Sequence, residues 1–272
     1  ATIGGFIAGG SGGIGSVRWG FLRDPGHLLG LEVVTMEPEP RVLQLEASDA
    51  EALNHAYGTN GIITALRLAT APRVDWQEVV VDCPDWTTAV ELAKRCSTAA
   101  IDLHLCSVLE AAVVELLPTW DLPPRPSDRL LLLVAPDAVS TVQRLATGVG
   151  AVLTHLGAEA DRQGNGLREL SWNHTTLHLR QREPDWTYLQ MLLPQPEIDC
   201  LDTLKQNWGE DLLWHLEAVR QQGVQRLASL PLVRWRGPEA LEQLMQQCRD
   251  LGALIFNPHV LTVEGGGLGV VD

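Results

Sequence analysis

Residues 171–178, SWNHTTLH, place many hydrogen-bonding side chains in one short stretch. If the stretch is helical, His174 and His178 lie one turn apart on the same face. A neutral imidazole can accept the proton of a substrate hydroxyl group, which is general base catalysis. The stretch therefore supplies three candidate catalytic residues, Asn173, His174 and His178. The alternative is that these side chains cap or bridge elements of the domain that carries them.

Two histidines at this spacing also resemble part of a zinc site. Zinc proteases use H-E-x-x-H with a third ligand elsewhere. Here the residues between the two histidines are Thr175, Thr176 and Leu177, so the acid of that motif is missing. We therefore expect no metal. Three further histidines, His104, His155 and His215, fall in apolar strand patterns and are expected to be structural.

Residues 2–20, TIGGFIAGGSGGIGSVRWG, contain eight glycines and no charge before Arg18. A chain usually keeps so much glycine where φ must be positive or where the backbone must approach a ligand closely. Successive backbone N–H groups in such a loop can cradle a phosphate group. The alternative interpretation is a glycine-rich surface loop.

Gly10, Gly12 and Gly15 also fit the dinucleotide fingerprint G-x-G-x-x-G. That fingerprint requires a strand before it, a helix after it and an acid about 20 residues further on. The residues that follow include glycine and proline, which disfavour a helix, and Glu32 lies inside a predicted strand. An NAD-binding protein would need a helix that starts between residues 13 and 16, and a parallel sheet.

The glycine-rich stretch resembles the second half of the flavin-binding domain of FAD-linked oxidases. This superfamily includes vanillyl-alcohol oxidase, p-cresol methylhydroxylase (PCMH) and the glycolate and D-lactate dehydrogenases. The matching residues are Thr2-Ile3-Gly4-Gly5, Ala8, Gly13, Arg18-Trp19-Gly20 and LLGLEVV at 28–34. A second motif, HAYGTNGIIT at 55–64, resembles the superfamily pattern G-[ST]-x-G-[TI]-x-G-[IV]-[IL]-T. Two motifs at this separation are far more specific than either alone.

The resemblance implies FAD as the cofactor and assigns the backbone that would line it. The implied cofactor-binding residues are Gly4, Gly5, Ala8, Gly13, Gly58, Gly61, Ile62 and Ile63. For Gly58 and Gly61 an ordinary turn before a strand is the alternative. WNHTTL at 172–177 and TYLQ at 187–190 resemble a subset of FAD-linked oxidases of uncertain substrate, in which the cap domain faces the flavin. The implied reaction is oxidation of a small hydroxylated or 2-hydroxy-acid substrate by hydride transfer to flavin.

The composition of the 272-residue chain limits its partners. A formal net charge of −14 argues against nucleic acid, which demands a basic face. No apolar run reaches the ~18 residues of a membrane span, and no signal peptide is visible. Five cysteines without a CxxC motif indicate buried free thiols in a reducing compartment. We therefore expect a cytoplasmic protein with a small-molecule substrate; a protein electron acceptor and a homodimer both stay open.

The change of pattern after residue 72 divides the chain into two expected domains. The resemblance implies that residues 1–72 are the second half of an FAD-binding domain whose first half is absent from this chain, and that 73–272 are a substrate or cap domain. The fold class is α+β: the C-terminal part of a PCMH-type FAD-binding domain, plus an antiparallel sheet with helices on one face. Ser48 is the expected N-cap of a short helix. Single strands are expected at 186–193, 212–219, 228–233 and 260–263.

The resemblance has one consequence for activity. The absent half of the flavin domain carries the first pyrophosphate loop in this superfamily, so this fragment alone is expected to be inactive. A second hypothesis is a non-catalytic binding module that keeps the fold without flavin.

Overall fold

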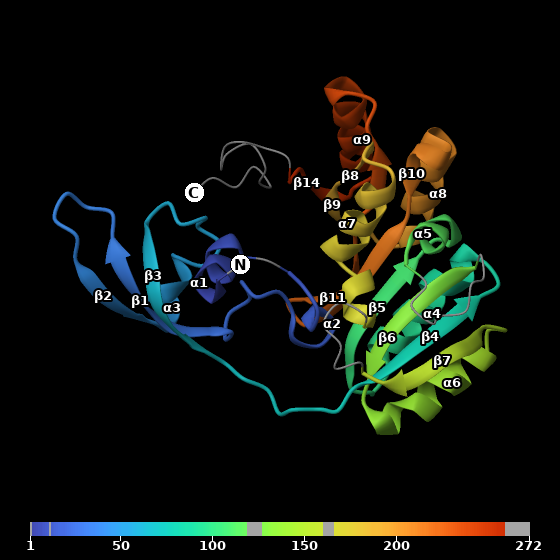
Figure 1. The fold of residues 1–272 in the computed structure, drawn as a ribbon, viewed down its shortest axis with the longest axis horizontal. Helices are drawn as coiled ribbons and strands as arrows, with labels where there is room; N and C mark the ends of the chain where they lie inside the picture. The colour runs from blue at the N-terminus through green and yellow to red at the C-terminus, as the bar shows by residue number, and fades with distance from the viewer. Residues whose placement is uncertain (1, 11, 119–126, 160–165, 259–272) are drawn as a thin grey trace.

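The computed structural model describes residues 2–10, 12–118, 127–159 and 166–258, and Figure 1 shows two bodies of sheet and helix. One is a three-stranded sheet formed early in the chain. The other is an eight-stranded sheet with a second three-stranded sheet beside it. All strand pairings among the described residues are antiparallel, which confirms the expected α+β class. The strand expected at 260–263 lies outside the described residues.

The small body is built on a β-hairpin. β1 (Leu28–Thr35) pairs with β2 (Val42–Glu46) and with β3 (Gly61–Leu68). Helices α1 (Ile3–Gly9) and α3 (Ala47–Glu51) cover one face of this sheet. The cluster beneath them consists of Ile7, Leu28, Leu31, Val33, Ala50 and Leu53.

Two local expectations for the small body are wrong. Residues 3–9 form helix α1 instead of a loop, with the Thr2 hydroxyl accepting a hydrogen bond from Gly5 N at 3.1 Å. Helix α3 begins at Ala47, so Ser48 lies inside it. The N-cap must have extended backbone, and Glu46, the last residue of β2, already has it (φ −120°, ψ 144°).

The dinucleotide hypothesis is also wrong. The helix that follows the third glycine of the fingerprint, α2 (Ser16–Trp19), has only four residues. The sheet of the small body is antiparallel, whereas the fingerprint belongs to a parallel βαβ unit.

The large sheet has the strand order β14-β9-β12-β11-β5-β6-β4-β7. Its strands are β4 (Gln77–Cys83), β5 (Leu103–Leu109), β6 (Asp128–Val134), β7 (Val152–Ala158), β9 (Gln190–Leu192), β11 (His215–Gln221), β12 (Val224–Ser229) and β14 (Leu254–Phe256). In β6 the run from residue 130 to 134 is fully buried, as its apolar pattern predicts for an interior strand.

Helices cover both faces of the large sheet. One face carries α4 (Trp86–Thr98), α6 (Val139–Thr147), α8 (Glu197–Trp208) and α9 (Pro238–Asp250), which share one apolar cluster with alternate strand residues. This is the helical face that the sequence predicts. The other face carries α5 (Ala111–Leu116) and α7 (Asn173–Arg182), with the 3-10 turn η2 (Leu167–Leu170) before α7. That second helical layer is an addition to the expected arrangement.

Three of the expected strands each break into two. The breaks fall at Leu189, Trp214 and Leu230-Pro231, and separate β8 (Trp186–Tyr188), β10 (Leu212–Leu213) and β13 (Leu232–Arg234) from the large sheet. Proline lacks the N–H that a strand ladder needs. Leu189 N donates to Pro231 O at 3.3 Å, and Leu230 N donates to His215 O at 2.9 Å. The three breaks therefore lie side by side. The sheet β10-β13-β8 separates from the large sheet along this line.

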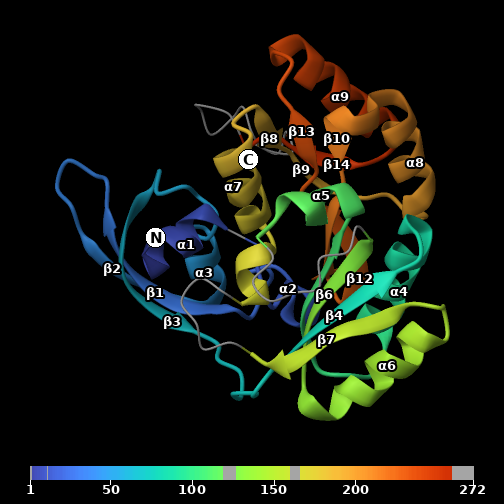
Figure 2. The ribbon, with the colours of Figure 1, turned by 45° about the vertical axis from the view of Figure 1, so that its right-hand side comes forward.

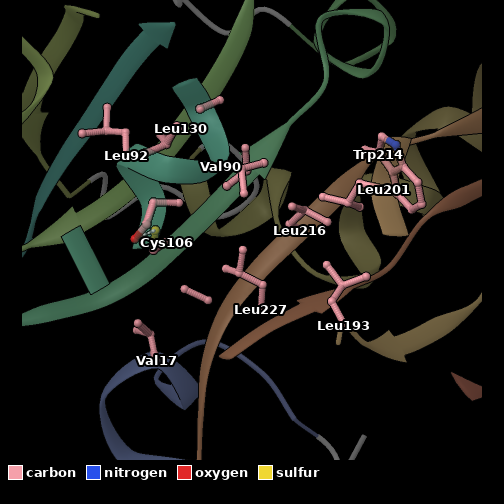
Figure 3. Packing of buried hydrophobic residues seen from close by; sticks show 14 of the residues in the cluster. Val17, Val90, Leu92, Cys106, Leu130, Leu193, Leu201, Trp214, Leu216 and Leu227 are labelled. Carbon is pink, nitrogen blue, oxygen red and sulfur yellow. Dashed lines mark hydrogen bonds between the residues drawn. The ribbon is translucent and has the colours of Figure 1, made fainter. Parts of the chain in front are cut away.

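The two bodies are joined by residues 69–76, which contain no helix or strand, and by α2 (Figures 1 and 2). Val17 of α2 belongs to the main cluster of the large sheet, and Figure 3 shows it beside Cys106 and Leu227. Gly15 N donates to His104 O of β5 at 2.9 Å. The end of the glycine-rich segment is thus packed on the large sheet. The domain boundary at 72/73 stays a prediction.

The five cysteines are free and buried, as expected, and the reducing compartment stays a prediction. Burial raises the pKa of Cys96 to about 12, and burial with nearby acids raises that of Cys83 to about 12. Among the helices of the described residues, none combines the length and the apolar character that crossing a bilayer requires.

Candidate functional site

A cavity of about 1350 Å³ lies where the glycine-rich segment meets the large sheet. Its walls come from residues 9, 10, 12–16, 19–23 and 25–27, from β9, β12 and β14, and from the start of α7. The glycines Gly9, Gly10, Gly12, Gly13 and Gly15 expose backbone along one wall. A Cβ built on Gly13 would have no atom within 4 Å, so the bare backbone there opens onto free space.

Two of the three predicted catalytic residues, Asn173 and His174, line this cavity. His174 Nδ1 lies 2.7 Å from Glu169 Oε2. With Nδ1 held by the carboxylate, Nε2 is the ring nitrogen left to act on a ligand. His178 is on the same helix, as predicted, but it is not among the cavity-lining residues, and its Nε2 lies 2.8 Å from Glu169 O. Glu169 therefore contacts both histidines.

Trp172, immediately before α7, holds an unusual backbone conformation. Its φ is 51° and its ψ −138°, a region where a bulky residue is strained by about 1–3 kcal/mol. Its indole lies beside Gly12, where an added Cβ would come within 3.3 Å of the ring. Such strain persists only where surrounding contacts enforce it.

Glu217 of β11 supplies such a contact. Its side chain is 1% exposed, and its carboxylate accepts hydrogen bonds from Trp172 N at 2.8 Å and from Ser107 Oγ at 2.7 Å. His215 Nε2 lies 2.7 Å from the same carboxylate. One buried acid thus fixes the turn that presents Trp172, Asn173 and His174 to the cavity. Sequence reasoning missed Glu217, because a single acid in an apolar strand gives no motif.

The residues assigned to FAD by resemblance lie mostly outside the cavity wall, and only Gly13 lines it. The structure does bring the two motifs together. Ile63 of β3 is the neighbour that a Cβ on Gly4 would meet, and Tyr57 N donates to Ala8 O at 2.8 Å. The second motif thus packs directly on helix α1.

The remaining assigned glycines have local roles in the small body. A Cβ on Gly61 would come within 2.3 Å of Val33 Cγ2, so glycine lets β3 approach β1. Gly58 has φ 74° in the turn before β3. Gly5 lies in the first turn of α1. Of the two isoleucines, Ile62 is 61% exposed, whereas Ile63 packs against the small-body cluster.

His104 is a cavity residue that the sequence analysis treated as structural. Its ring stacks on Trp76 at 4.8 Å between centroids, and its buried Nδ1 has no hydrogen-bond partner among the described residues. Gly15, with φ 97°, passes over this ring, where an added Cβ would lie 3.2 Å from His104 Cε1. Burial, with Arg168 and Arg18 nearby, lowers the pKa of His104 to about 4. A single histidine in an apolar strand pattern does not predict stacking on a tryptophan or a place in a cavity.

We expect His104 to make part of the free energy of unfolding depend on pH. The pKa falls from 6.5 to about 4 on folding, so the folded state binds fewer protons between these values. The His104 contribution is therefore complete above pH 6.5 and is lost as pH falls through about 4. Urea unfolding at several pH values measures it as the difference between wild type and His104→Phe, which keeps an aromatic ring over Trp76. A difference that does not change with pH would contradict the assignment.

Comparison with known proteins identifies the architecture. No family model matches the chain, and no curated protein matches its sequence. Two solved structures of alkyldihydroxyacetonephosphate synthase, in space groups P1 and P212121, match it with TM-scores of 0.68 and 0.66 and identities of 14% and 12%. Both matches cover 93% of this chain and 53% of the synthase chain.

Over the matched residues the fold is that of the alkyldihydroxyacetonephosphate synthase structures. The chain spans about half the length of the synthase structures that it matches, with 53% coverage of each.

Proposed function

We propose that this chain forms part of an FAD-dependent oxidoreductase that oxidises a small hydroxylated or 2-hydroxy-acid substrate. The observation that carries the proposal is the Glu169–His174 pair beside a glycine-walled cavity in an FAD-linked oxidase fold. The fold supports flavin. The cavity, at about 1350 Å³, exceeds the roughly 300–1,000 Å³ of typical small-ligand pockets, so its volume supports a ligand as large as a flavin.

The cavity lining fits a flavin. Apolar side chains such as Ile14 and Trp172 offer surfaces for an aromatic ring system, and Gln190 offers polar contacts at its edge. The backbone at Gly13 would be one of the groups that hold the cofactor. Bound flavin supplies a hydride acceptor for the oxidation.

The chain's own residues would handle the proton of that reaction. His174 Nε2 would accept the hydroxyl proton of the substrate, since Nδ1 is held by Glu169 at 2.7 Å. Glu169 would stabilise the imidazolium that forms and fix the ring orientation. Glu217 would act as a positioning residue, because it holds the turn from which His174 projects.

Gly13→Leu tests the proposal by filling the cavity. The residue is not among those with positive φ, and its Cβ position is free, so the fold should tolerate a side chain. We expect FAD affinity to weaken at least about tenfold, with the melting temperature close to that of wild type. Titration of tryptophan fluorescence measures binding, since Trp19 and Trp172 line the cavity.

Gly13→Ala is the matched control, because one added carbon leaves most of the space free; we expect its affinity to stay near wild type. Equal FAD binding by wild type and Gly13→Leu would place the flavin elsewhere. If the wild-type chain binds neither FAD nor riboflavin, the non-catalytic binding module becomes the better hypothesis for this chain.

A further inference from the structure

The cavity has an unusual charge for this protein. The whole chain carries a formal net charge of −14. Yet the described residues that line the cavity include one arginine and four histidines, and neither aspartate nor glutamate; the basic residues are Arg23, His27, His55, His104 and His174. Glu169 contacts His174 and Asp24 contacts Phe21, but no carboxylate of the described residues is itself part of the lining, so the cavity is suited to a ligand that bears negative charge.

Arg23 is the cation in this lining. Its guanidinium lies near the Phe21 ring, at 5.8 Å from the centroid, and its Nη1 donates to His55 Nδ1 at 3.4 Å. Within the part of the chain that the structure describes, no carboxylate lies within 4.0 Å of this guanidinium. Arg18, by contrast, pairs with Asp102 at 2.9 Å. Arg23 therefore keeps donor capacity for a ligand.

A chain of hydrogen bonds continues from Arg23 to Tyr57. Since arginine can only donate, His55 Nδ1 must accept, and the ring proton is on Nε2. Nε2 lies 2.8 Å from Tyr57 Oη, so the imidazole donates to the phenol oxygen. The Tyr57 hydroxyl proton is then left to donate outward. Burial and the charge of Arg23 lower the pKa of His55, which keeps its ring neutral as this relay requires.

The backbone holds this group in a strained conformation. His55 and Tyr57 both have positive φ, 61° and 55°, which non-glycine residues rarely adopt. Two carbonyls at the end of α1 hold them there, Ile7 O for His55 N at 3.0 Å and Ala8 O for Tyr57 N at 2.8 Å. Gly10 makes room for the imidazole, because a Cβ there would come within 2.3 Å of His55 Cγ. Strain of this kind gathers at ligand sites.

We propose that Arg23, His55 and Tyr57 form an anion-binding subsite of the cavity, which takes a carboxylate or phosphate group. Arg23 supplies the charge and Tyr57 a directed O–H donor, with His55 linking the two. The identity of the ligand rests on the proposed function, in which the anion belongs to the FAD diphosphate or to the carboxylate of a 2-hydroxy acid. The negative charge of the ligand does not rest on it.

Isothermal titration with inorganic diphosphate and with glycolate tests the subsite. For Arg23→Gln we expect at least about tenfold weaker binding of the anion that the site takes, because hydrogen bonds to charged groups are strong. Tyr57→Phe, which keeps the ring and loses the hydroxyl, should weaken it about three- to tenfold. Arg95→Gln is the matched control: Arg95 is exposed on α4, is not a cavity residue, and its loss changes net charge equally.

The same titrations separate the two sources of the anion. Diphosphate that competes with FAD but not with riboflavin assigns the subsite to the cofactor. Glycolate that binds the FAD-loaded chain and depends on Arg23 assigns it to the substrate. Anion binding that depends on Arg23, in a chain that binds neither flavin, would count against flavin binding in this cavity and keep the subsite.

Three results would overturn the subsite: no binding of either anion by wild type at millimolar concentration, equal binding by Arg23→Gln, or equal weakening in Arg95→Gln. If Arg23→Gln does not fold, Tyr57→Phe decides, because a phenyl ring preserves the packing of residue 57; unchanged anion affinity in that variant would then count against the subsite.

Discussion

Glu217→Leu is expected to lower the free energy of unfolding by about 3–5 kcal/mol. The carboxylate lies in the sheet interior and binds Ser107 Oγ, Trp172 N and His215 Nε2, all within 2.8 Å. Leucine fills a similar volume but leaves these three donors without an acceptor. A buried unpaired polar group carries the full desolvation penalty. Urea unfolding followed by circular dichroism measures the loss.

The same change should also disturb the cavity. Without the acceptor for Trp172 N, the strained turn before α7 has less to hold it, so the indole should lose its fixed place beside Gly12. Near-ultraviolet circular dichroism would report that loss under conditions where the chain is still folded. Glu217→Gln keeps one acceptor oxygen and should lose less. Glu115→Gln, an exposed change on α5, should stay within about 0.5 kcal/mol. A Glu217→Leu chain as stable as that control would refute the network.

Asp82→Ala is expected to have an effect of the same size, about 3–5 kcal/mol. Asp82 on β4 faces Arg129 on β6, its cross-strand partner, with the guanidinium Nε 2.6 Å and Nη2 3.2 Å from the two carboxylate oxygens. The side chains are 8% and 4% exposed. Removal of the acid leaves a charged guanidinium in the interior, where solvation is poor. Equilibrium unfolding in urea gives the magnitude.

A double replacement distinguishes the loss of charge compensation from the loss of packing. Asp82→Leu with Arg129→Met removes both charges and keeps apolar volume, so we expect it to recover at least half of the stability lost by Asp82→Ala. If the double variant is less stable than Asp82→Ala, the pair stabilises through packing and not through charge compensation.

The sequence predicts regular elements well where one local rule governs them. Asp85 is the N-cap of helix α4, and its carboxylate accepts a hydrogen bond from Thr88 N at 2.8 Å, as the sequence pattern of a cap indicates. Helix α9 buries Leu241, Leu244, Met245 and Cys248 on one face, as the periodicity of its apolar residues indicates. Caps and apolar stripes depend on neighbours within a few residues, so they can be read without a structure.

The candidate site depends on contacts between distant segments, and here prediction fails. Glu217 lies 45 residues from Trp172, whose N–H it accepts, and no local pattern links them. His55 and Tyr57 adopt positive φ only because α1 supplies the carbonyls that hold them. The helical state of residues 3–9 follows from packing on β3, which overrides the low helix propensity of glycine. His174 was found because His and Asn stand beside each other in sequence.

The positions of the cysteines make thiol alkylation a measure of how often one part of the molecule opens. All five thiols lie at or beyond Cys83, in the large-sheet body, and all are buried. With the pKa of Cys83, Cys96 and Cys248 near 12, a native thiol is almost never a thiolate and does not react. Alkylation rates therefore report how often the large-sheet body opens. They do not report opening of the small body formed by β1, β2 and β3. Opening of the large-sheet wall of the cavity can thus be measured separately from opening of the small body, with the natural sequence alone.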